Sequence, residues 1–503
     1  MQEPCPTPFN LAAYALAAAE TAPERIALQI VGLTGAERWS YGALTAAVRG
    51  IGTGLLGAGI GPGDRVLLRL GNTVDFPLAY LGAIAIGAVP IPTSSQLTAP
   101  EITAMAAQIA PAAVIAADGI ALPDHPARVI RAETLRSWRD LPPCAWQMGP
   151  PDRLGYMVFT SGTSGRPRAV MHAHRAVWAR RMMWEGWYGL TPSDRLMHAG
   201  AFNWTYTLGT GLLDPWAIGA TALIPAAGVE AAALPLLMKR FDATIFAAAP
   251  GVYRQLLKSD MKSLPKLRHG LSAGEALPQA IREAWTTATG TPVFEALGMS
   301  EVSTYVSASP ARPAPDGAVG WPQPGRRVAV LDGDGTELPP GAAGQLAVHR
   351  CDPGLFLGYW GAEAETVTRF HGDWFLTGDM VSQDESGAIR YLGRSDDLMN
   401  AGGYRVAPLE VERAFDSLPG LAESAAVALE VKPGVQVIAL FYRPDAAPLP
   451  EADLQAYAAR HLARYKQPRL YIPVEALPRG ANNKLNRRAL RDGWRPEEAR
   501  SHD

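Results

Sequence analysis

Short apolar runs alternate with segments of helical periodicity through the first part of the chain. Runs rich in Val, Ile and Leu predict buried strands, and apolar residues three or four positions apart predict helices. The predicted strands are residues 26–30, 65–70, 88–91 and 113–115, and the predicted helices are residues 11–20, a segment capped by Ser40, and residues 76–86 and 100–109. The alternation predicts a layered α/β domain. Residues 123–151 are rich in Pro and Arg and predict a surface loop.

The pattern changes twice further along the chain. Strands are predicted at residues 220–224, 243–247 and 267–271, and short antiparallel strands of a small β subdomain at residues 327–331, 344–348 and 388–391. Beyond Gly393, helices at 408–418 and 451–464 and strands at 425–430 and 437–442 predict a compact α+β unit. We therefore expect an α/β protein with a large N-terminal domain, residues 1–393, and a smaller, mobile α+β C-terminal domain, residues 394–503.

Composition narrows the class of protein. The 503 residues are too many for one core, and the net charge of −2 implies no broad basic surface for nucleic acid. Three widely spaced cysteines indicate neither a metal site nor a disulfide framework, which favours a reducing cytoplasm. The N-terminus lacks the pattern of a signal peptide. Prolines break the most apolar stretch, residues 76–92, so it predicts a buried helix and strand and no membrane span.

The stretch with the densest candidate chemistry is Phe159–Met171, which reads FTSGTSGRPRAVM. An apolar run, residues 156–159, precedes it as a predicted strand, and a helical pattern follows it. Glycines let backbone N–H groups approach an anion, hydroxyls add donors, and arginine matches phosphate oxygens. The stretch predicts a nucleotide-phosphate cradle, with a flexible Ser/Gly linker as the alternative. It lacks the Gly-Lys-Ser/Thr of the common NTPase loop.

Two other glycine patterns are rejected as nucleotide sites. Residues 52–57, GTGLLG, match the dinucleotide-binding spacing but lie at the end of a helical pattern, where glycines are expected to terminate the helix. Residues 209–211 lack a third glycine and lie in an apolar helical segment.

Phe159–Met171 resembles the signature loop of the AMP-forming adenylating enzymes, which include acyl- and aryl-CoA ligases, firefly-type luciferases and peptide-synthetase adenylation domains. Five further segments are similar to that family's motifs and occur in its order. They are SAGEA (272–276), EALGMSE (295–301), WFLTGD (374–379), LGRSDD (392–397) with GGYRV (402–406), and LPRGANNKLNRR (477–488). Aliphatic Leu297, where most members carry an aromatic residue, resembles the benzoate-CoA ligase branch.

The resemblance implies a site for ATP, Mg²⁺ and coenzyme A. It implies that the phosphates bind at Thr160, Ser161, Gly162, Thr163, Ser164, Gly165 and Arg168, with Ser300 at the α-phosphate, and the adenine at Gly274, Glu275, Ala276, Leu297, Gly298 and Met299. Asp379 would bind the ribose, Arg394 the ribose or phosphate, Glu301 the Mg²⁺, and Gly402 and Gly403 the pantetheine chain. Lys484, Thr163, Glu301 and Arg168 are the implied catalytic residues, and Asp396 is the implied hinge.

The sequence departs from the family pattern at three of these positions and at Asn483, next to Lys484. Arg168 replaces a usual Lys, Ser300 a usual Thr, and Asn483 the Gly that usually precedes Lys484. We expect each charge or hydroxyl to keep its function. Leu297 predicts weaker stacking on adenine than an aromatic ring would give.

The acid is expected to bind between Ala201–Tyr206, the end of the strand at Ser272 and the segment 297–305. The candidate contacts are Phe202, Asn203, Trp204, Ser272, Ala273, Met299 and Tyr305, with a core role as the alternative for the aromatic residues. No Lys or Arg is among them, which argues against a dicarboxylate. The resemblance thus implies a ligase for a small aryl, or a short to medium acyl, acid.

Two rival functions stay open: an adenylation enzyme that loads a carrier protein, and a non-catalytic nucleotide-binding protein of this fold. The expected partner is a small carboxylic acid, with neither nucleic acid nor membrane. A homodimer is an open alternative to a monomer.

Overall fold

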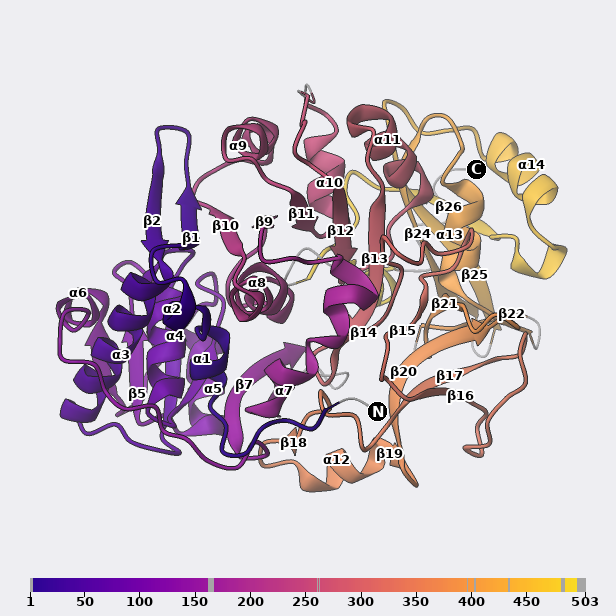
Figure 1. Ribbon diagram of the computed structural model, residues 1–503. Coiled ribbons are helices and arrows are strands. Elements are labelled where there is room, and N and C mark those ends of the chain that lie inside the picture. The colour runs from indigo at the N-terminus through magenta and orange to yellow at the C-terminus, as the bar shows by residue number, and fades with distance from the viewer. Residues whose placement is uncertain are drawn as a thin grey trace.

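The computed structural model describes residues 3–161, 167–259, 261, 263–395, 397–401, 404–432, 435–480 and 485–494 (Figure 1). A nine-stranded sheet forms the centre of the large domain, in the order β15-β14-β13-β12-β11-β9-β10-β1-β2. Its strands are β1 (Ile26–Val31), β2 (Ala36–Ser40), β9 (Arg195–His198), β10 (Thr221–Pro225), β11 (Ile245–Ala248), β12 (His269–Ala273), β13 (Val293–Met299), β14 (Ser303–Ser307) and β15 (Trp321–Pro322). The six strands from β13 to β1 pair in parallel, so the carboxyl ends of β9, β11, β12 and β13 meet at one edge.

A second, four-stranded parallel sheet has the order β4-β3-β5-β6. Its strands are β3 (Arg65–Arg69), β4 (Val89–Pro92), β5 (Ala113–Ala116) and β6 (Arg128–Arg131). The predicted α/β alternation is confirmed here, with α4 (Asp75–Ala85) and α5 (Ala99–Ile109) between strands. The predicted surface loop at residues 123–151 is wrong in part, because β6 and α6 (Ala132–Ser137) form within it and bury Ile130 and Leu135.

The remaining helices of the large domain cover these sheets. Asn10 caps the first helix by accepting from the backbone N–H groups of Ala12 and Ala13, but the predicted helix 11–20 is split in two. The elements are α1 (Leu11–Ala15), α2 (Ala18–Thr21), α3 (Tyr41–Gly57), α7 (Arg175–Ala179), α8 (Asp214–Ile218), α9 (Leu234–Arg240), α10 (Pro250–Leu256), α11 (Gln279–Thr289), the π-helical segments η1 (Trp184–Tyr188) and η2 (Thr207–Leu213), and the 3₁₀ turn η3 (Ala231–Ala233).

The glycine pattern at residues 52–57 lies at the end of a helix, as the sequence predicted, because α3 ends at Gly57. Gly52 and Gly54, within the helix, allow close packing. A Cβ on Gly54 would overlap the Trp138 ring, and one on Gly52 would lie 3.1 Å from the Ile86 side chain. The rejection of a dinucleotide site agrees with this packing, since the segment follows no strand and lies within a helix.

The candidate phosphate loop connects two antiparallel strands, β7 (Leu154–Ser161) and β8 (Pro167–Ala173). The helix predicted after Met171 is confirmed by α7, which begins at Arg175. The sequence did not predict the strand before it, in which residues 167–173 pair with β7 on one side and with β18 (Gly358–Tyr359) on the other. The loop is therefore the tip of a hairpin.

The small β subdomain is confirmed. It consists of β16 (Val328–Leu331), β17 (Ala343–His349), β19 (Phe370–His371), β20 (Trp374–Gln383) and β21 (Ile389–Arg394), all paired antiparallel, with α12 (Glu363–Thr368) beside it.

The C-terminal elements form cores of their own. They are β22 (Met399–Ala401), β23 (Tyr404–Val406), α13 (Pro408–Phe415), β24 (Leu421–Lys432), β25 (Val435–Pro444), α14 (Glu451–His461), η4 (Arg464–Lys466), β26 (Leu470–Pro473) and α15 (Arg487–Gly493). Two hydrophobic clusters draw all their buried members from residues 399–490. The α+β pattern was thus predicted correctly, and these elements lie together at one side of the molecule (Figure 1). Among the described residues, no helix is both long and apolar enough to cross a membrane.

Candidate active site

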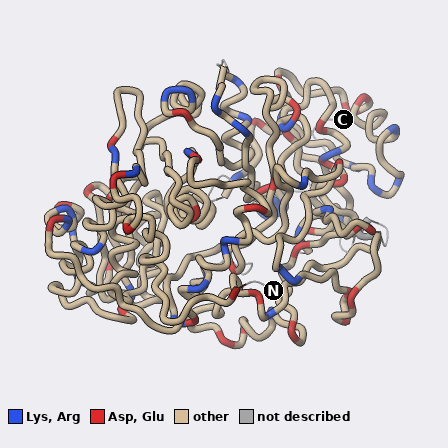
Figure 2. The backbone as a smooth tube through the Cα atoms, viewed as in Figure 1, with Lys and Arg blue, Asp and Glu red and all other residues tan. Residues whose placement is uncertain are grey.

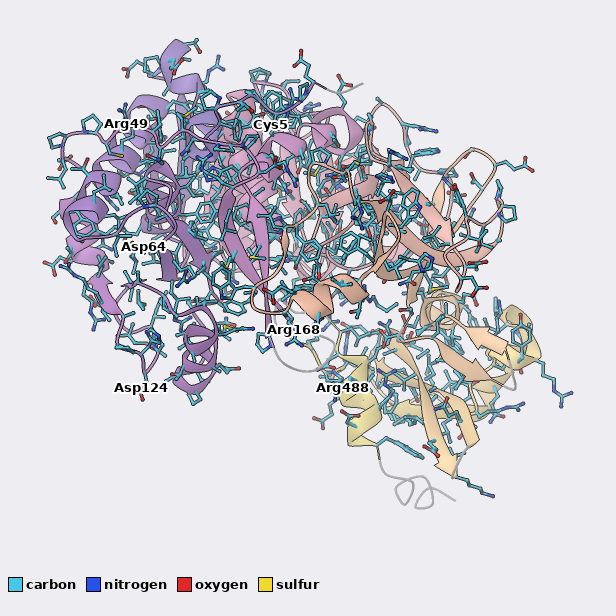
Figure 3. All side chains as sticks on the ribbon, turned by 90° about the horizontal axis from the view of Figure 1, so that it is seen from below. Cys5, Arg49, Asp64, Asp124, Arg168 and Arg488 are labelled. Atoms are coloured by element: carbon cyan, nitrogen blue, oxygen red, sulfur yellow. The ribbon has the colours of Figure 1, made fainter. Side chains whose placement is uncertain are left out.

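The phosphate hairpin, formed by β7 and β8, contacts α12 at its base, beside the small β subdomain. Thr160 on β7 lies opposite Arg168 on β8, and the Arg168 guanidinium forms an ion pair with Glu365 on α12. Figure 3 shows Arg168 on the side of the large domain that faces the C-terminal elements. Gly162, Thr163, Ser164 and Gly165, at the tip of the hairpin, lie outside the described residues.

The hairpin contacts the turn that carries Ser300 and Glu301. His172 on β8 donates from Nε2 to the carbonyl oxygen of Ser300 at 2.8 Å, and its ring stacks on Tyr156 with 4.8 Å between centroids. Burial lowers the pKa of His172 to about 4, so the ring is neutral at pH 7. Because a carbonyl only accepts, the proton is on Nε2. The turn after β13 is thereby fixed against the strand that leaves the phosphate loop.

Glu301 has one carboxylate oxygen occupied and one available. Oε1 accepts from the Tyr359 hydroxyl at 2.7 Å, and Oε2 has no hydrogen-bond partner among the described residues. Burial, together with the neighbouring carboxylate, raises the pKa of Tyr359, so the phenol stays protonated and donates. Tyr359 belongs to β18, which pairs with β8, so the same strand holds both the loop and the carboxylate. One oriented carboxylate oxygen suits Mg²⁺, which takes few protein ligands and completes its shell with water and phosphate oxygens. The residues present therefore fit the expected ion.

Asp379 lies on β20, buried among polar side chains from three strands. Oδ2 accepts from the Tyr305 hydroxyl at 3.2 Å, and Oδ1 accepts from Arg394 Nη1 at 3.1 Å. The Tyr391 hydroxyl lies 3.5 Å from Oδ1. Burial and Asp379 raise the pKa values of both phenols, which remain donors. Tyr305, a predicted acid contact, therefore contributes a hydrogen bond to the predicted ribose-binding carboxylate.

Gly298 is required by close approach at the β13–β14 hairpin. A Cβ there would lie 2.6 Å from the carbonyl oxygen of Ser303, and the pairing register shifts between Leu297 and Gly298. Ser303 itself has φ of 75°, an uncommon value for a residue with a side chain, and its hydroxyl accepts from Arg180. Three predicted nucleotide contacts, Leu297, Met299 and Ser300, are half-buried along this hairpin.

The predicted acid contacts differ in how they are placed. Asn203 and Trp204 are half-buried, whereas Phe202 is 1% exposed and stacks on Phe76 with 5.3 Å between centroids. Phe202 is therefore part of the core, the alternative that the sequence left open. Ser272 and Ala273 are buried at the end of β12, and the Ser272 hydroxyl has no partner among the described residues.

The sequence did not reveal a buried ion pair beside this region. Arg180 donates to both carboxylate oxygens of Asp214, with its Nη2 2.6 Å from Oδ2, and Tyr188 adds a hydrogen bond to the same carboxylate at 2.7 Å. The arginine charge is thus neutralised within the protein. The sequence offered no signal for the pair, because the two residues are 34 positions apart on elements of unremarkable composition.

The C-terminal elements contact the predicted adenine wall. Gly274 has φ of 99°, which turns the chain after β12, and Glu275 Oε1 accepts from the backbone N–H of Leu485 at 3.2 Å. Arg479 lies 3.9 Å from Glu275 and 2.8 Å from Glu423, and Glu423 also pairs with Arg254 of α10 at 2.9 Å. Burial raises the pKa of Glu423, but Arg254, Arg479 and Arg443 outweigh it and hold the pKa below its usual range. Leu485 follows Lys484, which, with Asp396, Gly402 and Gly403, lies outside the described residues.

The chain matches the family of AMP-binding enzymes over residues 16–360 and the AMP-binding enzyme C-terminal domain over residues 410–484. It belongs to the AMP-binding enzyme family.

Curated relatives and solved structures agree with this assignment. This AMP-binding enzyme is 30% identical to 3-hydroxybenzoate–CoA ligase of Aromatoleum sp. (strain CIB), covering 91% of the chain and 92% of that protein. It is 28% identical to mitochondrial acyl-coenzyme A synthetase ACSM3 of Mus musculus, covering 90% and 84%. The structure of a benzoate CoA ligase from Burkholderia xenovorans LB400 superposes with a TM-score of 0.86 at 27% identity, covering 96% of this chain and all of that one. The predicted family and fold class are confirmed.

The contacts between the motifs of this AMP-binding enzyme come from residues that the sequence did not single out. Tyr359 and Tyr391 orient the two carboxylates, His172 fixes the Ser300 turn, and Arg479 contacts Glu275. None of these four belongs to a metal-ligand or nucleophile pattern. Only their position in the fold identifies them.

Proposed function

We propose that this ATP-dependent, AMP-forming acid–thiol ligase converts a small aryl carboxylic acid to its coenzyme A thioester through an acyl-adenylate. The observation that supports this most is the set of contacts that joins the phosphate hairpin, Glu301, Asp379 and the C-terminal segment next to Lys484. In the family, these are the positions that bind phosphate, metal, ribose and the reacting carboxylate.

In the first step the acid carboxylate attacks the α-phosphorus of ATP. A carboxylate oxygen forms a bond to phosphorus, the bond from phosphorus to the bridging oxygen breaks, and pyrophosphate leaves. Mg²⁺ held at Glu301 would neutralise charge on the phosphate oxygens. We assign Asp379 to the ribose hydroxyls, Ser300 to the α-phosphate and Lys484 to the negative charge that develops between acid and phosphorus.

In the second step the coenzyme A thiolate attacks the acyl carbon, and AMP leaves with the oxygen that came from the acid. We propose that the C-terminal domain turns about Asp396 between the steps, withdrawing Lys484 and bringing Gly402 and Gly403 to the site. The contacts that Leu485, Arg479 and Glu423 make with Glu275 and Arg254 support the arrangement in which Lys484 is close to the nucleotide.

An aryl acid with no charged group besides its reacting carboxylate is the substrate class that best fits the acid side of the site. Trp204 and Tyr206 pack edge to face with 5.2 Å between centroids, and the nearby Arg180 is already paired with Asp214. A second substrate carboxylate would therefore meet no available cation among these residues. The relative named for 3-hydroxybenzoate supports an aryl acid. A short or medium acyl acid is the alternative, supported by the acyl-coenzyme A synthetase relative.

A panel of acids tests this assignment. With ATP, Mg²⁺ and coenzyme A, we expect AMP formation from benzoate-type acids at a kcat/KM at least about tenfold above that for butyrate or octanoate, because a flat ring buries more apolar surface between the aromatic side chains. Malonate and succinate should give no AMP above background. Preference for an alkyl acid would favour the acyl alternative, and activity on no acid would revive the non-catalytic one.

The charge cluster between the domains gives a separate prediction. Replacing Arg254 with alanine removes one partner of Glu423 but leaves Arg479, so we expect adenylate formation to slow by about two- to fivefold, the effect of losing a partly exposed ion pair. Thioester formation from preformed adenylate should be unchanged, since that step uses a different domain arrangement. Stopped-flow measurement of the two half-reactions distinguishes this result from a general loss of stability, which would slow both. Arg240→Ala, at an exposed arginine that ends α9, is the matched control.

Coenzyme A dependence separates the ligase from a carrier-loading enzyme. We expect AMP release to rise on addition of coenzyme A alone, and a requirement for a carrier protein would contradict the proposal.

A cytoplasmic location is part of the proposal and is supported by Cys5, Cys144 and Cys351, which are all free thiols. A homodimer stays open. Figure 2 shows Lys and Arg interspersed with Asp and Glu, which suits a small-molecule substrate better than nucleic acid.

A further inference from the structure

Two buried polar side chains beside the acid-binding segment have no partner in the protein. His198, the last residue of β9, has no exposed surface, and neither of its ring nitrogens forms a hydrogen bond within the described residues. Thr207, the first residue of η2, is also fully buried, and its hydroxyl is unpaired among the same residues. Buried polar groups are nearly always paired in folded proteins, so these two need an explanation.

The two side chains lie next to each other. Both approach Gly200, where a Cβ would overlap the Thr207 hydroxyl and would lie 3.0 Å from Cε1 of His198. Gly211 lies on the other side of the imidazole, where a Cβ would be 2.8 Å from the Cβ of His198. Because residues 200 and 211 are both glycine, no Cβ fills the space beside the imidazole and the hydroxyl.

This pair adjoins the segment expected to bind the acid. The His198 ring lies edge to face on Tyr206 with 4.4 Å between centroids, and Tyr206 in turn contacts Trp204. The Tyr206 hydroxyl donates to the carbonyl oxygen of Leu271 on β12, two residues before Ala273. The carboxyl ends of β9 and β12, with β11 between them, thus bring His198 and the predicted acid contacts to one edge of the sheet.

The chemistry of the pair limits what it can bind. Burial lowers the pKa of His198 to about 3, so at pH 7 the ring is neutral and offers one N–H donor and one acceptor. A threonine hydroxyl also donates and accepts. A neutral ligand group that does both, such as a phenolic hydroxyl, satisfies both side chains, whereas a methyl group or a ring hydrogen leaves them unpaired.

We propose that His198 and Thr207 bind a hydroxyl substituent on the ring of the acid and so make the enzyme selective for hydroxylated aryl acids. This inference rests on the proposed function and names its substrate class more closely. The carboxylate of the acid reacts at the nucleotide, and the substituent is held by the end of β9. The two residues act on specificity and take no part in the chemical steps.

Matched acids test the proposal on the unaltered enzyme. We compare kcat/KM for AMP formation with 3-hydroxybenzoate and 4-hydroxybenzoate against the corresponding methylbenzoates and benzoate. A site that pairs a substrate hydroxyl rejects analogues that lack it, so we expect at least one hydroxybenzoate to exceed its methyl analogue by about 10- to 100-fold, mainly through KM. If the hydroxybenzoate and the methylbenzoate gave equal kcat/KM at both ring positions, the inference would be overturned while the proposed function stayed intact. Absence of AMP with every acid would instead contradict the proposed function.

Variants then assign the preference to the pair. His198→Phe keeps a buried ring but removes both nitrogens, and Thr207→Val removes the hydroxyl. Each should reduce the ratio of hydroxybenzoate to methylbenzoate kcat/KM by about tenfold or more, because the variant lacks a group that pairs with the substrate hydroxyl. His269→Phe is the matched control, because His269 is a buried, neutral histidine at the opposite end of β12, two strands away from β9. An unchanged ratio in both Thr207→Val and His198→Phe would show that the pair binds structural water, and would overturn the inference.

Discussion

Replacing Lys484 with alanine is expected to slow adenylate formation by about 10² or more and to leave thioester formation from preformed adenylate nearly intact. The lysine adjoins Leu485, whose backbone N–H donates to Glu275 beside the predicted adenine wall. We expect its ammonium to stabilise negative charge that develops only while the carboxylate attacks phosphorus. In the proposed second step the C-terminal domain turns away, so the same charge should matter little.

Measurement of the two half-reactions separately checks this expectation. Acid-dependent exchange between ATP and pyrophosphate reports the first step, and single-turnover release of AMP from a supplied acyl-adenylate reports the second. Arg488→Ala is the control, since Arg488 is exposed on α15 of the same domain and pairs only with exposed Asp492 among the residues described. An equal loss in both half-reactions of Lys484→Ala would contradict the assigned role.

Replacing Glu301 with glutamine is expected to lower the rate of adenylate formation by about 10² and to raise the Mg²⁺ concentration needed for half-maximal rate. Glutamine keeps a carbonyl oxygen that can still accept from Tyr359, so the local fold should persist. The change removes the negative charge that a hard divalent cation prefers. Titration of the exchange rate with Mg²⁺ measures the effect.

Two companion variants separate metal binding from positioning. Tyr359→Phe keeps the charge of Glu301 but removes the hydrogen bond that orients its carboxylate, so we expect only a few-fold lower rate of adenylate formation. Glu283→Gln, an exposed carboxylate on α11, should change neither the rate nor the Mg²⁺ requirement. An unaltered Mg²⁺ requirement in Glu301→Gln would contradict the assignment of Mg²⁺ to this residue.

Most of the layered fold could be predicted from the sequence because its signals are local. Apolar runs such as 65–70 and 113–115 are buried on both faces, as parallel strands flanked by helices require. Asn10 and Ser40 mark helix starts through their own side chains. The strand at residues 167–173 was not predicted because it depends on partners outside it, namely β7 and the distant β18.

The site could be predicted only where one residue type acts within one motif. Glu301 and Asp379 could be proposed because each is a carboxylate at a fixed place in a family motif. Their hydrogen-bond partners Tyr359 and Tyr391 lie 58 and 12 positions away, and no local pattern joins them. Phe202 shows the opposite error, since an aromatic residue in a candidate pocket segment has the same local signal as a core residue.

The transfer of oxygen from the acid to AMP tests the central claim most directly. The enzyme is supplied with ATP, Mg²⁺, coenzyme A and an aryl acid labelled with ¹⁸O in its carboxylate, and the products are analysed by mass spectrometry. If the carboxylate attacks the α-phosphorus and the thiol then displaces AMP, one labelled oxygen appears in AMP and none in pyrophosphate. Label in inorganic phosphate or pyrophosphate, or thioester formed with unlabelled AMP, would contradict activation through an acyl-adenylate.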